Sequence, residues 1–269
     1  MGSRILVAGG TSPGRVLVVD PLGNADYTTI QAAINAANGQ SPTAAAQWLI
    51  LVAPGRYEES LTLYDYVNVA GLAPDKAAFL DATGSPAIAT AATCTVSHLR
   101  VAGDTAPIVR ANVAGKTLRL VNVIMEEDDA EVDGLAISTG TVELYDCHLQ
   151  AGGPALAISG GTARVSGSLL RHTHGSVLAA TEGALEVGGG TVELVRCVLE
   201  NTAPAGPAVD FTAAPIAAKL LQCILRPVSG ANAIDADVAV TAVVAACLGT
   251  AGIHANVSGV VSYTEDATI

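Results

Sequence analysis

The feature that most constrains this chain is an eight-residue phrase that returns at intervals of 21 to 29 residues. Each copy begins with two apolar residues separated by one residue, so that apolar and other residues alternate. One extra residue then interrupts this alternation, and Cys, Ser or an aliphatic residue follows. The clearest copies are Val142–Leu149, Val192–Leu199 and Ala218–Leu225, and related ones begin at Cys94, Leu118, Ala163 and Ala242. Self-similarity at a period of about 20–50 residues is the signature of a solenoid.

The alternation inside each copy is that of a short β-strand. Val142 and Leu144 share one side of such a strand, and Glu143 lies on the other. After the break, the next apolar residues would turn outward unless the chain bends there. Asn, Asp and Gly tolerate the left-handed backbone angles of a bend, whereas Arg196 and Gln222 have no such preference. The residues predicted to lie at this corner are His98, Asn122, Asp146, Gly167, Arg196, Gln222 and Ala246.

Gly-, Pro- and Ala-rich turns such as Ala151–Pro154 and Thr202–Pro207 separate the copies, with no helix between them. Short strands joined only by turns predict an all-β solenoid, the parallel β-helix, in which each coil pairs with the next at about 4.8 Å. Leucine-rich repeats have a similar period, but their Asn and Leu scaffold is missing here.

Four of the five cysteines follow directly after a predicted corner. They point inward in this interpretation, and we expect them to form one buried structural file along the axis of the rod. Neighbouring coils would bring the thiols close to one another, but small buried thiols are simpler than disulfides, and no pair has the two-residue spacing of a zinc site. The predicted file is Cys147, Ser168, Cys197, Cys223 and Cys247.

Composition limits the classes of partner. Half of the residues are apolar, only 14% are charged, and the net charge is −12. A nucleic-acid partner needs clustered Lys and Arg, and an anionic membrane surface attracts basic segments, so we predict neither partner. Ile5–Ala8 and Val16–Val19 are too short to span a membrane and make a poor signal peptide. We therefore expect the chain to be cytoplasmic at synthesis.

We expect a single β-helix domain over residues 1–269, with a strand or arm at 1–18, a cap region at 19–48, coils at 49–250 and a closing segment at 251–269. The cap region contains a short α-helix at about 28–37, with Thr28 as its N-cap and Gln31 completing a capping box. Its apolar face would cover the open first coil. This face consists of Ile30, Ala33, Ile34 and Ala37.

Two stretches carry a resemblance to a known family. Val19–Ile34 and Trp48–Glu59 together resemble the opening of pectin methylesterases, over roughly residues 16–72. More broadly, the chain is similar to the pectin-lyase-like superfamily of right-handed parallel β-helices. The resemblance implies that the coils wind in the right-handed sense. The same opening occurs on virus tail and surface proteins that use the β-helix as a scaffold.

The motifs that carry pectin methylesterase chemistry are missing. That family has paired aspartates, an arginine and glutamines in stretches such as Gln-Asp-Thr-Leu, Asp-Phe-Ile-Phe-Gly and Gly-Arg-Pro-Trp, and none of these occurs here. The only tryptophan, Trp48, lies upstream of the expected site, and Gln150 is followed by Ala151 instead of Asp. We therefore assign no catalytic and no cofactor-binding residue from the resemblance.

Two clusters contain metal-ligating side chains. His172 and His174 lie on the same side of an extended segment, but no third ligand follows them. The densest acidic run is a weak Ca²⁺ candidate whose order of acids matches no calcium-binding loop, and we predict no metal site. This run is Glu126, Glu127, Asp128 and Asp129, with Glu131 and Asp133 nearby.

The sequence shows no catalytic constellation, and we predict a non-enzymatic structural or adhesive scaffold, foremost a virion or tail component of a bacteriophage. No helix closes the last coil, so we expect a second copy or another assembly protein to cover it, with a homotrimer favoured. Two alternatives stay open: a carbohydrate-active enzyme, either a polysaccharide lyase or an esterase like those acting on pectin, and a module that binds surface polysaccharide. A cleft with two carboxylates and an Arg or Lys would favour the enzyme.

Overall fold

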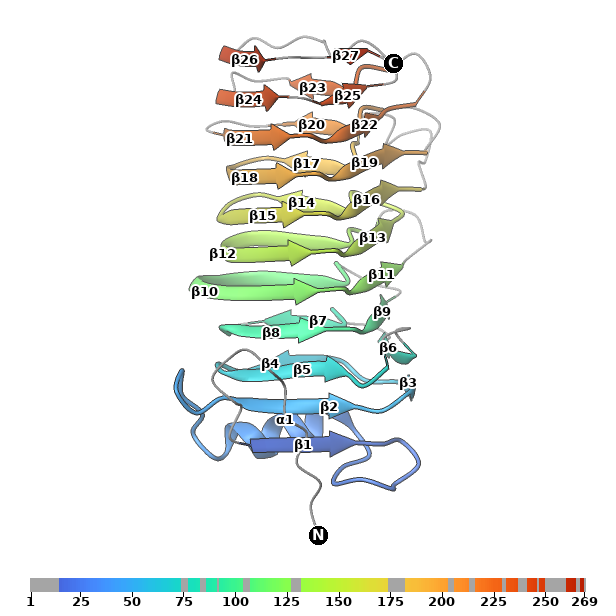
Figure 1. The fold of residues 1–269 in the computed structure, drawn as a ribbon, viewed down its shortest axis with the longest axis vertical. Coiled ribbons are helices and arrows are strands. Elements are labelled where there is room, and N and C mark those ends of the chain that lie inside the picture. Colours follow the sequence, from blue (N-terminus) through green and yellow to red (C-terminus); the bar gives the residue numbers. More distant parts are fainter. Residues whose placement is uncertain are drawn as a thin grey trace.

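The computed structural model describes residues 15–73, 77–82, 86–90, 92–103, 107–126, 132–173, 182–202, 206–212, 216–228, 231–236, 241–245, 247–249, 260–264 and 267–268. These residues form a right-handed parallel β-helix with one short helix, which confirms the predicted fold class. The coils stack from β1 (Arg15–Val19) and α1 (Ile30–Asn38) at one end of the rod to β26 (Val260–Thr264) and β27 (Ala267–Thr268) at the other (Figure 1).

Each coil contributes strands to three parallel sheets, here called front, rear and side (Figure 1). Between β1 and β26, the front sheet contains β2 (Trp48–Val52), β5 (Val67–Gly71), β8 (Cys94–Ser97), β10 (Val109–Val121), β12 (Leu135–Tyr145), β15 (Thr162–Ser166), β18 (Gly190–Val195), β21 (Ile216–Leu221) and β24 (Thr241–Ala245).

The rear sheet shares β10 and β12 with the front sheet, because each of these two long strands bends around the corner between the two sheets. Its other strands are β4 (Leu61–Leu63), β7 (Ile88–Thr90), β14 (Leu156–Ile158), β17 (Leu185–Val187), β20 (Val209–Phe211) and β23 (Ile234–Ala236). Before β27, the side sheet contains β3 (Gly55–Tyr57), β6 (Ala78–Ala82), β9 (Arg100–Gly103), β11 (Ile124–Glu126), β13 (His148–Ala151), β16 (Leu169–His172), β19 (Val198–Asn201), β22 (Ile224–Arg226) and β25 (Leu248–Gly249).

The core is a set of inward columns that run along the rod. Neighbouring strands of the front sheet pair in register, so the same position of the repeated phrase lies above itself in successive coils. One such column is completely or almost completely buried and consists of Val96, Leu120, Leu144, Val165, Leu194, Leu220 and Val244. The sequence repeat is therefore one rung of the core, and burial of these columns is the main favourable contribution to folding.

The corner between the front and side sheets lies where the phase slip predicts it. His98, Asn122, Asp146, Gly167, Arg196 and Gln222 all have φ between 52° and 64°, while Ala246 lies outside the described residues. Left-handed geometry costs a residue other than Gly about 1–2 kcal/mol, yet Arg196 and Gln222 adopt it. Position in the coil therefore overrides residue preference. The backbone N–H of each corner residue donates to a carbonyl of the next coil, as from Asn122 to Tyr145 at 2.8 Å.

The corner between the rear and front sheets uses glycine instead. Gly140, Gly161 and Gly190 have φ of 82°, 79° and 85° and lie on successive coils. A Cβ atom on Gly161 would lie 2.6 Å from the carbonyl oxygen of Gly140, and one on Gly190 would lie 2.5 Å from that of Gly161. At this corner the backbones pack too closely for any side chain.

Helix α1 lies at the first coil and packs against β1, β2, β4 and β5, as predicted for a cap. The predicted N-cap is wrong by one residue, because Thr29 and not Thr28 caps the helix. The predicted capping box is also absent: Gln31 binds the backbone N–H of Thr62 through Oε1 at 2.7 Å, and Glu59 accepts from the N–H groups of Ile30 and Gln31. No helix in the described part of the chain is long and apolar enough to cross a membrane.

Strands at both ends of the stack lie outside residues 49–250. The coils begin at β1, which pairs with β2, and not at residue 49. The closing segment contributes β26 and β27, which pair with β24 and β25 and add a further coil.

Candidate active site: a groove on the rear sheet

A groove crosses the outer surface of the rear sheet. Arg110, Ala136, Ala157 and Glu186 are in register on four successive coils and share the outward face. The two alanines form a low floor between two long side chains, which leaves a groove of about 240 Å³. Arg110 and Glu186 are three coils apart, or about 14 Å at the usual strand spacing.

Asp133 lines the groove just before β12 begins. Its side chain lies against Gly153, where a Cβ atom would be 3.1 Å from Oδ1, so a small residue at 153 makes room for the carboxylate. Burial, together with the negative charges of Glu186 and Glu182, raises the pKa of Asp133 to about 6. An ordinary aspartate titrates near 3.9, so this one holds its proton much closer to neutral pH.

Glu186 is the second carboxylate of the groove. Its Oε1 accepts a hydrogen bond from the Thr212 hydroxyl at 3.5 Å. Asp210 and Asp235 follow it in register on β20 and β23, so three acidic residues occupy one outward column on successive coils. Like charges directly opposite one another destabilise a sheet. Repulsion within the column therefore opposes folding at neutral pH, and Asp210 in its middle is only 7% exposed.

The groove combines three groups that acid–base chemistry requires. Asp133 is a carboxylic acid that can release or keep a proton near pH 6, and Glu186 supplies a second carboxyl group. Arg110 supplies a guanidinium group that binds oxyanions and carboxylates. A residue whose pKa is shifted by burial and by named charges, in a cleft, is a candidate for general acid–base catalysis.

A second hollow, of about 200 Å³, lies on the front sheet. It is lined by Gln47, Tyr66, Asn68, Thr95 and Arg119, among others. The amide of Asn68 is already engaged, since it donates to Gln47 Oε1 at 2.8 Å and accepts from the Thr95 N–H at 2.8 Å. These polar groups serve the pairing of coils, which makes the rear groove the stronger candidate.

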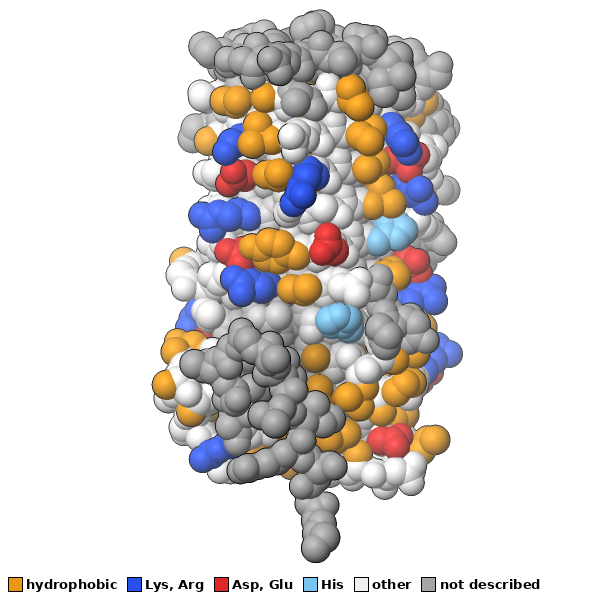
Figure 2. Space-filling view, in the orientation of Figure 1, with side chains coloured by type: hydrophobic (Ala, Val, Ile, Leu, Met, Phe, Trp, Pro, Cys, Tyr) orange, Lys and Arg blue, Asp and Glu red, His pale blue; other side chains and the backbone are white. Residues whose placement is uncertain are grey.

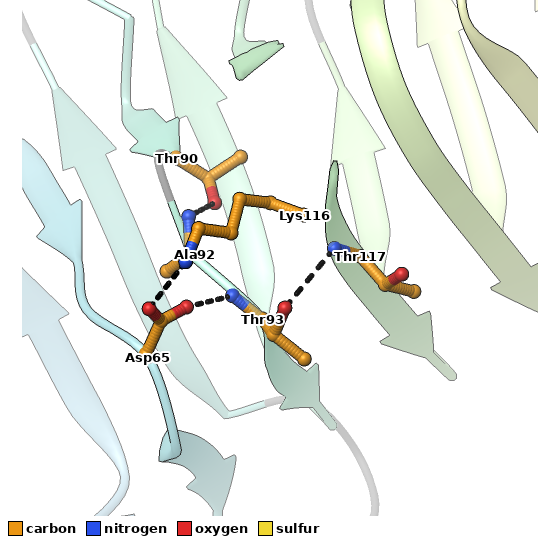
Figure 3. A network of polar contacts seen from close by, with 6 residues as sticks. All are labelled: Asp65, Thr90, Ala92, Thr93, Lys116 and Thr117. Carbon is orange, nitrogen blue, oxygen red and sulfur yellow. Dashed lines mark hydrogen bonds and ion pairs between the residues drawn. The ribbon is translucent and has the colours of Figure 1, made fainter. Parts of the chain in front are cut away.

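A polar network next to this hollow ties three coils together (Figure 3). Asp65 accepts hydrogen bonds from the Thr93 N–H at 2.6 Å and from Lys116 at 2.5 Å, and Thr93 Oγ1 accepts from the Thr117 N–H at 3.4 Å. Burial raises the pKa of Asp65, but the bonds from Lys116 and Thr93 outweigh it, so that the pKa lies below its usual value. Asp65 stays ionised and holds the coils together, in contrast to Asp133.

The structure places the predicted file of cysteines inside the rod. Cys147, Ser168, Cys197, Cys223 and Cys247 are each at most 3% exposed, and all the cysteines are free thiols. The N–H of Cys147 donates to Ser168 Oγ at 3.0 Å, and the N–H of Cys223 donates to Cys247 Sγ at 3.4 Å. Side chains of the file thus satisfy backbone groups that the left-handed corner leaves out of the strand ladder.

Of the candidates for metal binding, only Glu126 and His172 belong to the part of the chain that the structure describes. Glu126 forms an ion pair with Arg100 at 2.5 Å, while Glu127, Asp128 and Asp129 lie outside the described residues, as does His174. His172 is completely buried inside the coil. Across the described ranges, no group of three or more His, Cys, Asp or Glu side chains could hold a metal ion.

Sequence reasoning did not single out Arg110 or Glu186, and it treated Asp133 only as part of an acidic run. The available signal was the strand that precedes each repeated phrase. Aligned coil by coil, its outward position reads Arg110, Ala136, Ala157, Glu186, Asp210 and Asp235.

Comparison with solved structures identifies the fold. The chain has the pectin-lyase-like right-handed parallel β-helix fold. It is similar to pectin methylesterase PemA from Erwinia chrysanthemi, with a TM-score of 0.56 and 13% identity, covering 89% of this chain and 81% of that one. It is also similar to a deglycosylated pectin methylesterase from Aspergillus niger, with a TM-score of 0.55 and 13% identity, covering 96% of this chain and 86% of that one.

A third similar structure is a pectin methylesterase mutant in complex with a hexasaccharide, with a TM-score of 0.54 and 14% identity, covering 82% of this chain and 80% of that one. No protein-family model and no curated protein matches the sequence. At this level of identity the likeness extends to the fold alone, and the chemistry has to be argued from the residues of the groove.

Proposed function

We propose that the protein is a carbohydrate-active enzyme that binds a polysaccharide in the rear groove and hydrolyses an ester or glycosidic bond there. Asp133 acts as the general acid, Glu186 as the carboxylate that activates water, and Arg110 as the group that binds an anionic oxygen of the substrate. The observation that carries the proposal is the pKa of Asp133, raised to about 6 next to Glu186 in an open groove that also contains Arg110.

The shape of the groove supports a chain-like ligand. Its floor of Ala136 and Ala157 lies between taller residues of the coils on either side, so a polymer can lie across the rod, parallel to the strands. Ser138 and Ser159 add hydroxyl groups on the side of the groove away from Asp133. Because the pectin methylesterase motifs are missing, the proposed acid and base are residues of this chain and are not carried over from that family.

Turnover on a panel of esterified and de-esterified pectins and capsular polysaccharides tests the proposal. We expect wild-type turnover that falls as the pH rises through about 6, because Asp133 then loses its proton. Asp133→Asn and Glu186→Gln should each lose at least about 100-fold. Glu193→Gln, on the front sheet, is the matched control and should retain activity.

A groove-filling variant separates the alternatives. Ala157→Trp should abolish both binding and turnover by occupying the floor. Binding without turnover, lost in Ala157→Trp, would identify a sugar-binding module instead. The proposal would be contradicted if the protein neither bound nor turned over any polysaccharide in the panel.

A non-enzymatic scaffold is the second candidate, favoured by the ion pairs that join successive coils on the other two sheets. Arg119 pairs with Glu143 on the front sheet, and Arg171 with Glu200 on the side sheet, both at 2.7 Å. Such cross-coil pairs suit a stiff rod in a phage tail or another assembly, as a homo-oligomer. Light scattering that shows a monomer at micromolar concentration would contradict the oligomeric part.

A further inference from the structure

Two polar side chains are buried inside the coil behind the groove. His172 is completely buried and Asn201 is 4% exposed, and the two are in register on β16 and β19 of the side sheet. The corresponding residue one coil earlier is Ala151, which is apolar. A polar group in such an interior is stable only with hydrogen-bond partners, so its contacts show what it holds.

Both side chains reach the same backbone carbonyl. Asn201 Nδ2 donates to the carbonyl oxygen of Glu182 at 2.8 Å and to that of Pro207 at 2.9 Å. His172 Nδ1 lies 3.3 Å from the carbonyl oxygen of Glu182. These two carbonyls belong to the segments that lead from the side sheet into β17 and β20 of the rear sheet.

The segment that begins at Glu182 forms one end of the groove. Glu186 lies four residues after Glu182 and lines the groove from β17. The negative charges of Glu182 and Glu186 both act on Asp133 across the groove. Holding the Glu182 carbonyl therefore fixes where the Glu182 carboxylate lies relative to Asp133, while pairing of β17 with β14 and β20 holds Glu186.

We propose that Asn201 and His172 are positioning residues: from inside the coil they hold the backbone at Glu182 in place and so set the distance of the Glu182 carboxylate from Asp133. The role in catalysis rests on the proposed function, but the positioning itself does not. Among the described residues, the charged groups that act on Asp133 are Glu182 and Glu186, and Arg110 from β10 lines the same groove. Release of the Glu182 backbone would move the Glu182 carboxylate and leave Glu186 and Arg110 in place.

A pH titration of the Asp133 carboxyl by ¹³C NMR, without any glycan, tests the positioning. In Asn201→Ala the Glu182 carboxylate is released, and the midpoint of Asp133 should fall by up to about one pH unit toward the ordinary aspartate value, while burial and Glu186 still act on it. The matched control is Ser168→Ala. Ser168 is equally buried and bonds Ser166 and Cys147 in the file, away from the groove, so its loss should leave the Asp133 midpoint unchanged.

A second variant keeps the test decisive if Asn201→Ala does not fold. Asn201→Ser retains a hydroxyl donor that is too short to bond both carbonyls, and it should shift the midpoint in the same direction by a smaller amount. A wild-type midpoint in whichever of the two variants folds would overturn the inference. Because no substrate is present, absence of turnover on every polysaccharide would remove the proposed function and leave this result standing.

Discussion

The front and rear sheets wind around the same core, but they treat charge in opposite ways. On the front sheet, positive and negative side chains alternate from coil to coil in one outward column, which Figure 2 shows as alternating blue and red side chains. Glu143 lies between two arginines at 2.7 and 3.6 Å, and Glu193 pairs with Lys219 at 2.9 Å. The column consists of Arg119, Glu143, Arg164, Glu193 and Lys219.

On the rear sheet the outward column sorts charge by sign. Arg110 stands at one end, two alanines follow, and then Glu186, Asp210 and Asp235 succeed one another. Backbone geometry does not explain the difference, because both sheets pair in register with the same coils. A local arrangement that opposes folding, next to one that supports it, is typical of a functional site. The unfavourable repulsion between the acids of the rear column therefore marks the groove as the functional site.

The largest expected effect is at Asp133 and tests directly how much the charges of the rear sheet reduce the stability of the fold. Since its pKa is raised from about 3.8 to about 6, the folded state binds the proton more tightly than the unfolded state does. The free energy of unfolding therefore falls as the pH rises from about 4 to 6 and stays lower above that range. We expect Asp133→Asn to be more stable than wild type by about 2 kcal/mol at pH 8, after allowance for solvent screening.

Urea unfolding at several pH values measures this difference. Below about pH 4 the wild-type carboxyl is protonated in both states, so the advantage of Asp133→Asn should vanish. A constant difference across the pH range would show that the effect comes from packing and not from the charge of Asp133.

The second prediction concerns a substitution that gives the front column a run of like charges, as in the rear column. Arg164→Glu would place a glutamate between Glu143 and Glu193, so that three glutamates follow one another on successive coils. Loss of one ion pair and gain of two repulsions should destabilise the protein by about 1–1.5 kcal/mol at low salt, and added salt should reduce the loss. Arg164→Gln, which removes the charge without reversing it, should cost about half as much. Equal losses in both variants would contradict an electrostatic cause.

The coils and their corners followed from the sequence because their signals are local. Burial of alternate residues appears in each eight-residue phrase, and the phase slip located the corner even at Arg196 and Gln222, where residue preference disagreed. The error at the helix N-cap has a non-local cause. Glu59, 29 residues after Ile30, supplies the carboxylate to the first turn of α1, which no pattern within the helix reveals.

The groove was not predicted because it depends on register across unequal coils. Arg110 and Asp133 are 23 residues apart, and Asp133 and Glu186 are 53 residues apart. Their approach depends on the lengths of intervening turns, which vary between copies of the phrase. His172 illustrates the same limit: its spacing from His174 indicated a metal pair, whereas its buried contact is the carbonyl of Glu182.

The smallest expected effect contrasts the same substitution on the two sheets. Glu143→Gln removes the acceptor of two arginines and should lower the free energy of unfolding by about 0.5 kcal/mol, the usual range for a surface ion pair. Glu186→Gln removes a negative charge that acts on Asp133 and lies one coil from Asp210, so it should be neutral or slightly stabilising. Paired urea denaturation at pH 7 and low salt measures both. A similar loss in the free energy of unfolding for Glu186→Gln would mean that the rear acids are stabilised to the same extent as those of the front sheet. The difference between the two columns would then no longer indicate where the protein functions.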